Sequence, residues 1–159
     1  MNSNIEIVHA STDHAEEVAP LFDTYRCWSG QESDLGGALS FIRQRLASSE
    51  SEIFFIRRQN QTVAFTQLYP MFSSMSLARI WIINDLYVVE SARRTGLGTV
   101  LLETAAEFAR ALGAVRIRLE TKHNNATARA AFEALGWQQD RDFLHYQLDL
   151  AESDVLKSS

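Results

Sequence analysis

The chain has 159 residues, of which 46% are apolar, which suits one domain with a sizeable core; we expect a single domain over residues 1–159, with a frayed tail at 152–159. A formal net charge of −5 disfavours nucleic acid as a partner, and no apolar stretch approaches the roughly 18 to 20 residues of a membrane-spanning helix. The single cysteine, Cys27, excludes an intrachain disulfide and a cysteine-rich zinc site, and fits a cytoplasmic location.

The first part of the chain predicts a strand followed by two helices. Residues 5–9 alternate in the manner of a short strand. Asp13, with Glu16 three residues later, is typical of a helix start, and Pro20 in the helical pattern that follows predicts a kink or a broken helix. A polar, glycine-bearing stretch at 28–37 predicts a loop. Helical spacing then indicates a second short helix that carries Leu39, Ile42 and Leu46.

The middle of the chain predicts the central strands of a sheet. Residues 53–56 and 63–69 flank a polar turn at 59–61, which indicates a hairpin. Residues 77–89 form a long, mostly apolar run, which predicts a largely buried strand.

The remaining part predicts two helices and two strands. Apolar residues recur at steps of three and four over 101–112 until Gly113, and again over 128–135 until Gly136, which indicates two helices with glycine stops. Alternation predicts a strand at 115–119 between them, and a last strand at 143–150. The order is mixed α+β, with a strand-helix-strand unit at its centre.

The most informative stretch is the basic, glycine-bearing turn Arg93-Arg94-Thr95-Gly96-Leu97-Gly98, which joins the long strand to the first of these helices. Free amides at a helix N-terminus and the positive end of its dipole attract phosphate, and glycines allow close backbone approach. An ordinary glycine turn with solvated arginines is the alternative. The dinucleotide-binding fingerprint requires a third glycine, and this chain has Leu101 at that position. The phosphate-binding loop of nucleotide-binding proteins requires Gly-Lys-Ser/Thr, which is also missing from this turn, so neither pattern is met.

This turn resembles the coenzyme A motif Gln/Arg-x-x-Gly-x-Gly/Ala of the GCN5-related N-acetyltransferase (GNAT) superfamily. Downstream, residues 125–137 resemble the family's Asn-containing helix that ends in Tyr-Glu-x-x-Gly-Phe. The resemblance covers roughly residues 5–150. It implies a GNAT-like acyl-CoA N-acyltransferase fold, in which a mixed, mostly antiparallel, splayed sheet is flanked by helices.

The resemblance also implies acetyl-CoA as cosubstrate. The pyrophosphate would lie on the amides from Arg94 to Gly98, and the pantetheine arm beside the strand at 86–88, in the manner of a strand added to a sheet edge. Asn125 resembles a polar contact to the coenzyme arm, although it can equally be a helix N-cap. The expected cofactor-binding residues are Leu86, Tyr87, Val88, Arg93, Arg94, Thr95, Gly96, Leu97, Gly98, Thr99, Asn125 and Phe132.

Acetylation of an amine requires a proton acceptor, because an alkyl ammonium with a pKa near 10.4 is mostly protonated at neutral pH. We favour Asp85, since some polyamine-acetylating relatives carry an acidic pair where this chain has Asn84-Asp85. The alternative for Asp85 is a strand-end carboxylate paired with an arginine. Glu120, at the end of the next strand, is a weaker candidate.

The acid position departs from the family, because the helix residue that is often a tyrosine is Phe132 here. A phenyl ring donates no proton, but a thiol with a pKa near 8.5 can depart largely as thiolate. Tyr146 is our catalytic candidate for this role, and Tyr87 or a water could also fill it. His123 and His145 lack metal-ligand spacing, so we expect no metal site.

In this superfamily the amine pocket forms from the region after the first strand and from the middle hairpin, and aromatics with carboxylates suit a cation. Alternatively, the aromatics here are core residues and the two carboxylates in the loop cap the second helix. We expect acetyl transfer to a primary amine of a small molecule such as a polyamine, diamine or amino acid; protein N-acetylation and a non-catalytic acyl-CoA binding module are the alternatives. We also expect a homodimer in which residues 143–150 help to form the contact. The expected substrate-binding residues are Tyr25, Trp28, Glu32, Asp34, Gln67, Tyr69, Asn84 and Asp85.

Overall fold

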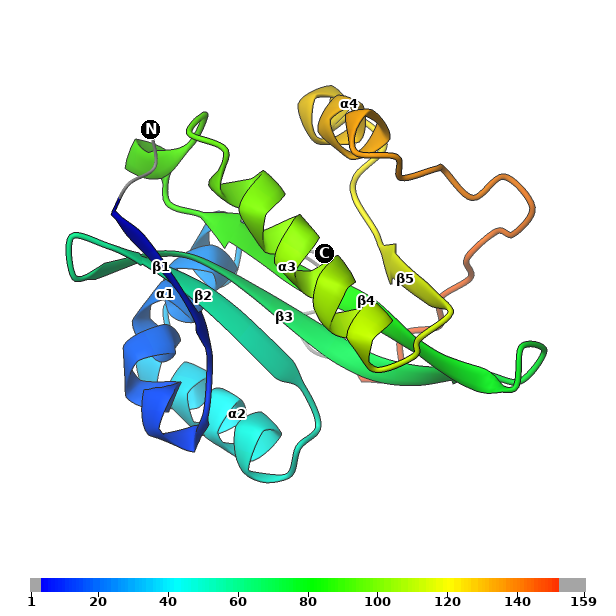
Figure 1. Ribbon diagram of the computed structural model, residues 1–159. Helices are drawn as coiled ribbons and strands as arrows, with labels where there is room; N and C mark the ends of the chain where they lie inside the picture. The colour runs from blue at the N-terminus through cyan, green and yellow to red at the C-terminus, as the bar shows by residue number, and fades with distance from the viewer. Residues whose placement is uncertain (1–3, 152–159) are drawn as a thin grey trace.

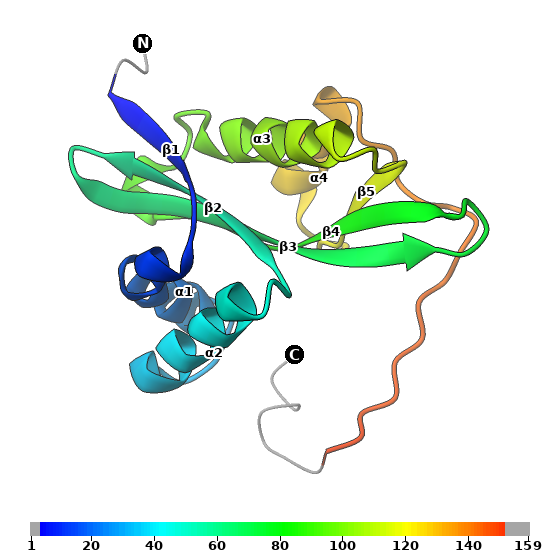
Figure 2. The ribbon, with the colours of Figure 1, turned by 60° about the horizontal axis from the view of Figure 1, so that its bottom comes forward.

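The computed structural model describes residues 4–151, which form a five-stranded sheet with helices on both faces (Figures 1 and 2). Strand order follows the chain, β1-β2-β3-β4-β5; the first three pairings are antiparallel and β5 joins β4 in parallel. Figure 2 shows α1 and α2 on one face, and α3 and α4 on the other. The expected mixed, mostly antiparallel α+β fold is therefore confirmed. The elements are β1 (Ile5–His9), η1 (Thr12–His14), α1 (Ala15–Trp28), α2 (Leu35–Ala47), β2 (Glu52–Arg58), β3 (Gln61–Ser73), β4 (Ala78–Val88), η2 (Glu90–Ala92), α3 (Leu97–Ala111), β5 (Arg116–Leu119) and α4 (Ala126–Ala134).

Each face of the sheet has its own apolar cluster. Trp81 of β4 packs with Leu101 of α3 on one face, while Phe55 and Phe65 pack with Ile42 of α2 on the other. Side chains of a strand alternate between faces, and both faces are covered here. This explains why the central strands read as almost continuous apolar runs.

Helix α1 continues through Pro20, so the predicted break is wrong. Proline removes the hydrogen bond to the carbonyl of residue i−4, which is Glu16, and its ring crowds that carbonyl. Both Pro20 and Glu16 are exposed, so water can satisfy that carbonyl. The continuous helix therefore positions the aromatic residues at its C-terminal end, Tyr25 and Trp28, beside β4.

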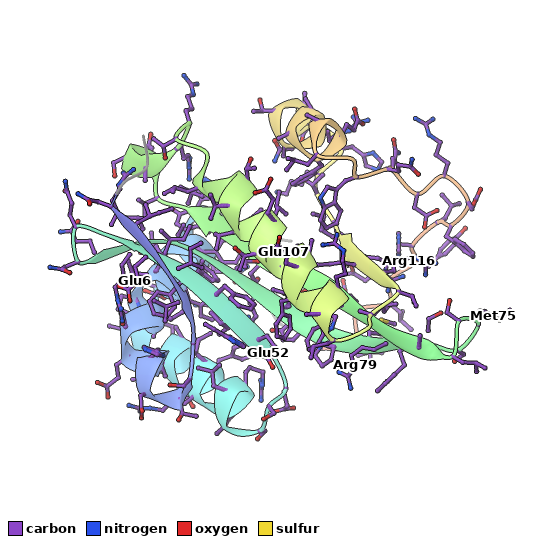
Figure 3. All side chains as sticks on the ribbon, in the orientation of Figure 1. Glu6, Glu52, Met75, Arg79, Glu107 and Arg116 are labelled. Atoms are coloured by element: carbon purple, nitrogen blue, oxygen red, sulfur yellow. The ribbon has the colours of Figure 1, made fainter. Side chains whose placement is uncertain are left out.

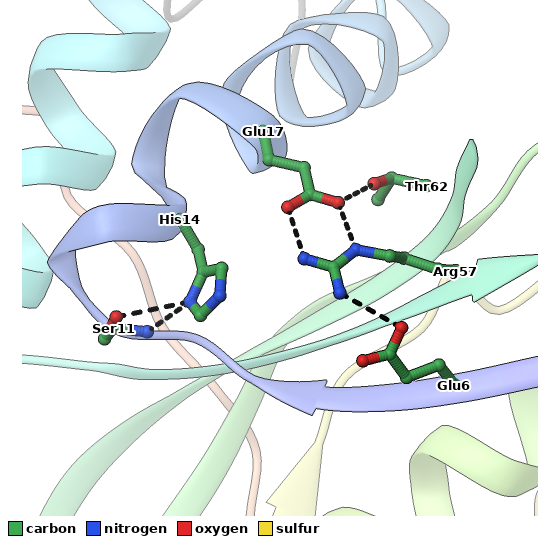
Figure 4. Close-up of polar contacts among 6 residues, drawn as sticks. All are labelled: Glu6, Ser11, His14, Glu17, Arg57 and Thr62. Atoms are coloured by element: carbon green, nitrogen blue, oxygen red, sulfur yellow. Dashed lines mark hydrogen bonds and ion pairs between the residues drawn. The ribbon is translucent and has the colours of Figure 1, made fainter. Parts of the chain in front are cut away.

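A bidentate ion pair holds α1 against the strands (Figure 4). Two nitrogens of Arg57 on β2 donate to Glu17 of α1 at 2.6 and 2.7 Å, and a third donates to Glu6 of β1 at 3.0 Å. Thr62 of β3 also donates to Glu17, at 3.0 Å. The hydrogen bonds from Arg57 are the main reason that the pKa of Glu17 is lowered.

The loop after α1 is shorter than predicted, because α2 already begins at Leu35. The Asp34 carboxylate accepts from the Gly37 amide at 2.9 Å, which confirms its interpretation as a helix cap. Asp23 of α1 fixes the loop from below: its carboxylate accepts from the Ser33 hydroxyl at 2.6 Å and from the Asp34 amide at 2.8 Å.

Strand β3 extends beyond its predicted end at 69 and passes through Pro70. The pairing of β2 with β3 stops at Leu68, so Pro70 lies where β3 has β4 as its only neighbouring strand. Proline is tolerated on such a half-paired stretch because fewer ladder hydrogen bonds are lost.

The predicted last strand at 143–150 is wrong: these residues pair with no strand among residues 4–151. Figures 1 and 2 show the segment after α4 running past β5 and then away from the sheet. An amphipathic pattern makes a strand only where a sheet edge supplies hydrogen-bond partners, which this pattern cannot specify. No helix within the described residues is long and apolar enough to cross a membrane.

Candidate active site

A β-bulge in β4 decides which face the key carboxylate occupies. Gln67 of β3 pairs with Asp85, but the next residue, Leu68, pairs with Ile83, so Asn84 is an extra residue in β4. A bulge reverses the alternation of the strand. Ile83 packs on the α3 face, whereas Tyr87 packs on the α1 and α2 face. The bulge thus places Asp85 with Tyr87 on the face of α1 and α2.

Asp85 is buried, with 7% of its surface exposed, and belongs to a polar network inside that face. The amides of Gln67 and Asn84 donate to the carboxylate oxygen Oδ2 at 2.8 and 3.2 Å, and the Tyr25 hydroxyl is a third donor. The Gln67 carbonyl oxygen in turn accepts from the Ser51 hydroxyl at 2.8 Å. Among residues 4–151 no arginine pairs with Asp85, so the alternative of an arginine ion pair is wrong for the described part of the chain.

Burial raises the pKa of Asp85, and the three hydrogen bonds from Gln67, Asn84 and Tyr25 only partly oppose this effect. The pKa of Tyr25 is also raised, first by burial and then by the negative charge of Asp85. The same two causes raise the pKa of Tyr69 to about 12. Both tyrosines therefore remain protonated donors beside Asp85, whose own proton affinity is increased.

Aromatic rings extend from this network to the glycine-bearing turn. Tyr25 and Tyr87 lie 5.7 Å apart between centroids, and Trp28 lies 5.8 Å from Tyr87. The Arg93 guanidinium lies 5.6 Å from the Trp28 ring and 5.5 Å from the Tyr87 ring, and its Nε donates to the Val88 carbonyl at 3.0 Å. Arg93 thus fastens the turn to the aromatic end of α1.

The turn itself has the conformation of an anion site. Arg94 and Gly96 have positive φ values, 63° and 84°, and Gly96 caps α3. The amides of the first turn of α3 have no partners within the helix. A Cβ added at Gly96 or Gly98 would meet no atom within 4 Å, so the space beside the Cα atoms of these two glycines is open. The residues present fit a phosphate group bound there.

The sheet is splayed beside this turn, as expected. β5 pairs with Ile80 to Ile83 of β4, and the rest of β4, through Val88, has no strand on that side among the residues that the structure describes. Figure 1 shows the two strands diverging toward the start of α3. This backbone edge at 86–88, where the Val88 carbonyl already accepts from Arg93, can take an extended ligand as an added strand.

Other predicted residues lie apart from the buried network. Glu32, in the loop before α2, is exposed, and so is Glu120, after β5. Asn125 caps α4 by accepting from the Ala128 amide at 3.3 Å, as one of its two interpretations predicted. Phe132 is half-buried near Trp137, at 6.4 Å between centroids. Tyr146 is 90% exposed in the segment without strand structure.

Two polar residues of the network, Ser51 and Thr66, were not predicted. Both are buried; Ser51 supports Gln67, and the Thr66 hydroxyl donates to the Asp85 carbonyl at 2.9 Å. The sequence signal for a buried polar network was the pair Thr66 and Gln67 inside an otherwise apolar strand. Buried polar side chains need hydrogen-bond partners, so such a pair predicts further polar residues nearby.

Comparison with known proteins agrees with this geometry. Residues 16–137 match the model of the acetyltransferase (GNAT) family. The chain is 43% identical over 146 residues to the uncharacterized N-acetyltransferase YhfO of Bacillus subtilis, covering 92% of this chain and 98% of that protein. It is 31% identical over 121 residues to a probable acetyltransferase of Haemophilus influenzae, covering 76% and 83%. The crystal structure of a probable acetyltransferase superposes with a TM-score of 0.87 at 38% identity, over 93% of this chain and 99% of that one. The chain therefore belongs to the GNAT family of acetyltransferases.

Proposed function

We propose that this protein transfers the acetyl group of acetyl-CoA to a primary amine of a small molecule, by direct attack of the amine on the thioester. The observation that supports this most is the buried Asp85, which lies on β4 immediately before the edge at 86–88, and the proposed anion site follows that strand in the chain. Strand β4 thus carries both the proposed proton acceptor, Asp85, and the edge at 86–88 where the acyl donor would bind.

Acetyl-CoA supplies an activated acetyl thioester. The amides from Arg94 to Gly98 would hold its pyrophosphate, because they combine open space with the positive end of the α3 dipole. The edge of β4 at 86–88 would hold the pantetheine arm, and Thr99, Asn125 and Phe132 complete the proposed cofactor-binding set.

Asp85 would receive the proton of the attacking amine, directly or through water. Its raised pKa suits this role, because a base is most effective when its pKa approaches the working pH. Gln67, Asn84 and Tyr25 orient the carboxyl by hydrogen bonds. An ammonium group is also attracted to aromatic faces such as that of Trp28.

The burial of Asp85 favours a small acceptor over a protein chain. Its carboxyl is surrounded by Gln67, Asn84 and Tyr25, and Trp28 is the exposed member of the aromatic group, at 61%. A compact amine head can reach a carboxyl that is 7% exposed more readily than a side chain fixed to a folded protein. Glu32 and Tyr69 remain proposed members of the acceptor site.

The leaving thiol has no tyrosine at position 132. We propose that it departs largely as thiolate, since its pKa is near 8.5, with Tyr146 or a water as the proton donor. We also propose a cytoplasmic homodimer, supported by the exposed apolar residues of 143–150 and by a single cysteine that suits a reducing compartment.

A panel of amines incubated with acetyl-CoA tests the function, with the free coenzyme thiol as readout. We expect at least one polyamine, diamine or amino acid to release thiol well above the hydrolysis measured without amine. Lysine-containing peptides and protein N-termini form the second arm. Release with peptides alone would overturn the small-molecule acceptor, and tight acetyl-CoA binding without release from any amine would overturn catalysis.

A further inference from the structure

Arg118 of β5 is a half-buried cation without a matching carboxylate among residues 4–151. Its described polar contact is a hydrogen bond from Nη2 to the Met71 sulfur at 3.2 Å. A thioether is a weak acceptor, and a charge that is partly withdrawn from water is unfavourable unless it is paired. Arg118 is therefore available to bind an anion. Other arginines of the described chain do pair with carboxylates: Arg26, Arg43, Arg45 and Arg57.

Arg118 points to the face of the sheet that carries α1 and α2. Ile117 and Leu119 pack toward the α3 core, so the residue between them points to the opposite face. Strand β4 lies between β5 and β3, and the guanidinium of Arg118 reaches across it to Met71 of β3. This is the face on which the buried Asp85 lies.

One row of β3 side chains connects Asp85 with Arg118. Gln67, Tyr69 and Met71 are alternate residues of the strand and so share a face. Gln67 donates to Asp85 at 2.8 Å, Met71 contacts Arg118, and Tyr69 lies between them. The row spans roughly 13 Å from its first to its last residue. A ligand that makes hydrogen bonds of about 3 Å at each end therefore needs polar groups about 7 Å apart.

The row is open beyond the two helices. The apolar cluster beneath α1 and α2 includes Phe65 of β3 but neither Tyr69 nor Met71, and Met71 is 44% exposed. Figure 2 shows β3 and β4 extending past both helices. A small molecule can thus lie along the row, with one end at Asp85 and the other at Arg118.

We propose that Arg118 binds a carboxylate at the far end of the acceptor, so that the acceptor is an ω-amino acid whose amine and carboxylate are about 7 Å apart. The inference rests on the proposed function, which assigns the amine end to Asp85. A guanidinium matches a carboxylate with two parallel hydrogen bonds, and its single charge is balanced by one carboxylate, whereas a phosphate carries roughly two charges. A chain of about six carbons spans this distance.

Calorimetric titration of 6-aminohexanoate and its uncharged amide, 6-aminohexanamide, in the presence of coenzyme A tests the proposal without any variant. The two ligands share the amine and the chain length and differ in the charge offered to Arg118. We expect the acid to bind about 10- to 100-fold more tightly than the amide, the range for a charge-assisted hydrogen-bonded pair. Equal affinities would overturn the proposal.

Variants then assign the preference to a residue. Arg118→Gln should bring the two affinities together, and Arg118→Lys, which keeps the charge without the planar fork, should retain part of the difference. Arg118→Glu should favour 1,6-diaminohexane instead, because an anion then faces the far end of the ligand. A preference for the acid that persists in Arg118→Gln would overturn the proposal.

Arg79→Gln is the matched control, because it removes the same charge from the other face of the sheet. The Arg79 guanidinium lies 5.4 Å from the ring of Trp81, which packs on the α3 side. Figure 3 labels Arg79, near the start of β4, and Arg116, at the start of the neighbouring β5. Arg79→Gln should keep the wild-type preference, and an equal loss in this variant would refute a specific role for Arg118.

Thiol release from acetyl-CoA with the same ligands separates this inference from the function on which it rests. We expect the acid to react with a lower KM than the amide. If both react with equal KM and bind equally, acetyl transfer stands and the role of Arg118 is wrong. If the acid binds preferentially through Arg118 but no amine releases thiol, the carboxylate site stands and the proposed reaction is wrong.

Discussion

Asp85 acts, in our proposal, through its protonation, so its replacement by the isosteric amide is the most direct test. Asp85→Asn keeps the shape of the side chain but cannot accept the proton of the amine. We expect turnover to fall on the order of 10² to 10⁴-fold, with acetyl-CoA affinity changed little, because the proposed anion site consists of backbone amides at 94–98 and does not include this carboxyl. Steady-state kinetics with the accepted amine and titration of the cofactor measure the two quantities.

Glu120→Gln is the control for this prediction, because Glu120 is the other carboxylate considered as a base and is exposed. We expect it to retain wild-type turnover. If turnover stays at the wild-type rate in Asp85→Asn and falls in Glu120→Gln, the general base is Glu120 and not Asp85.

Two buried carboxylates predict opposite pH dependences of stability. The pKa of Asp85 is raised, so the folded state holds its proton more tightly than the unfolded chain; its contribution to stability is present below about pH 3.9 and is lost as pH rises through the folded pKa. The pKa of Asp23 is lowered by its bonds to Ser33 and Asp34, so its contribution is lost as pH falls.

Thermal melting against pH, from about pH 2 to 9, measures both effects, because the Asp23 contribution is lost mainly below its unfolded pKa of about 3.9. The stability of the wild type relative to Asp85→Asn should decrease with rising pH, whereas that relative to Asp23→Asn should decrease with falling pH. Parallel slopes for the two variants would show that Asp85 is not protonated more readily when buried.

Phe132 tests whether the reaction needs an acid from α4. Phe132→Tyr adds one hydroxyl to a half-buried ring, and turnover should stay unchanged or rise modestly, because a thiolate is already a tolerable leaving group. A hydroxyl buried without a partner costs about 1 to 3 kcal/mol, so melting must accompany the kinetics. Phe132→Leu should retain turnover to within a few-fold. A folded Phe132→Tyr enzyme that is several hundred-fold faster would contradict our view of the leaving group.

The proposed anion site at the first turn of α3 is a property of the whole helix, because the free amides and the helix dipole would attract a phosphate together. Gly96→Asp places a negative charge where the pyrophosphate is proposed to lie and should weaken acetyl-CoA binding strongly. Gly96→Asn is the matched control: it has nearly the same size and the same strain at a φ of 84°, but no charge. Calorimetric titration compares them. Equal affinities in the two folded variants would show that no anion sits at this turn.

Two structural features position the residues around Asp85 although they are not proposed to contact a substrate. They are the bulge in β4 and the bidentate ion pair between Arg57 and Glu17 of α1. The bulge turns Asp85 to the face of α1, and the Arg57 to Glu17 pair holds α1 so that Tyr25 reaches Asp85. We expect a loss of the Arg57 pair to affect the acceptor side first, because the pair holds α1, which carries Tyr25.

The two faces of the molecule divide the proposed functions. The α1 and α2 face holds the buried acid and aromatic residues, and the opposite face carries α3, whose N-terminus forms the proposed anion site. The divergence of β5 from β4 leaves the strand between these faces accessible. Direct transfer between two substrates needs such an arrangement, in which each approaches from its own side.

Much of this protein was determined by its sequence alone. Periodicity predicted four helices and the first five strands, and glycine stops ended α3 and α4 as expected. The turn from Arg93 to Gly98 lies at the start of α3, where the sequence motif placed it. These features are local: they depend on side-chain spacing and on backbone conformations that a short stretch encodes. The continuity of α1 at Pro20 was missed because solvent exposure of Glu16, not propensity, decided it.

Only the tertiary structure decided the rest. Three features join residues that are distant in sequence, so no local pattern specifies them. They are the bulge at Asn84, the hydrogen-bonded chain from Ser51 through Gln67 to Asp85, and the contact of Arg93 with the Trp28 ring. The segment at 143–150 shows the same limit most plainly. Its alternating pattern is that of a strand, but a strand exists only where an edge meets its backbone, and the location of that edge is a property of the folded assembly.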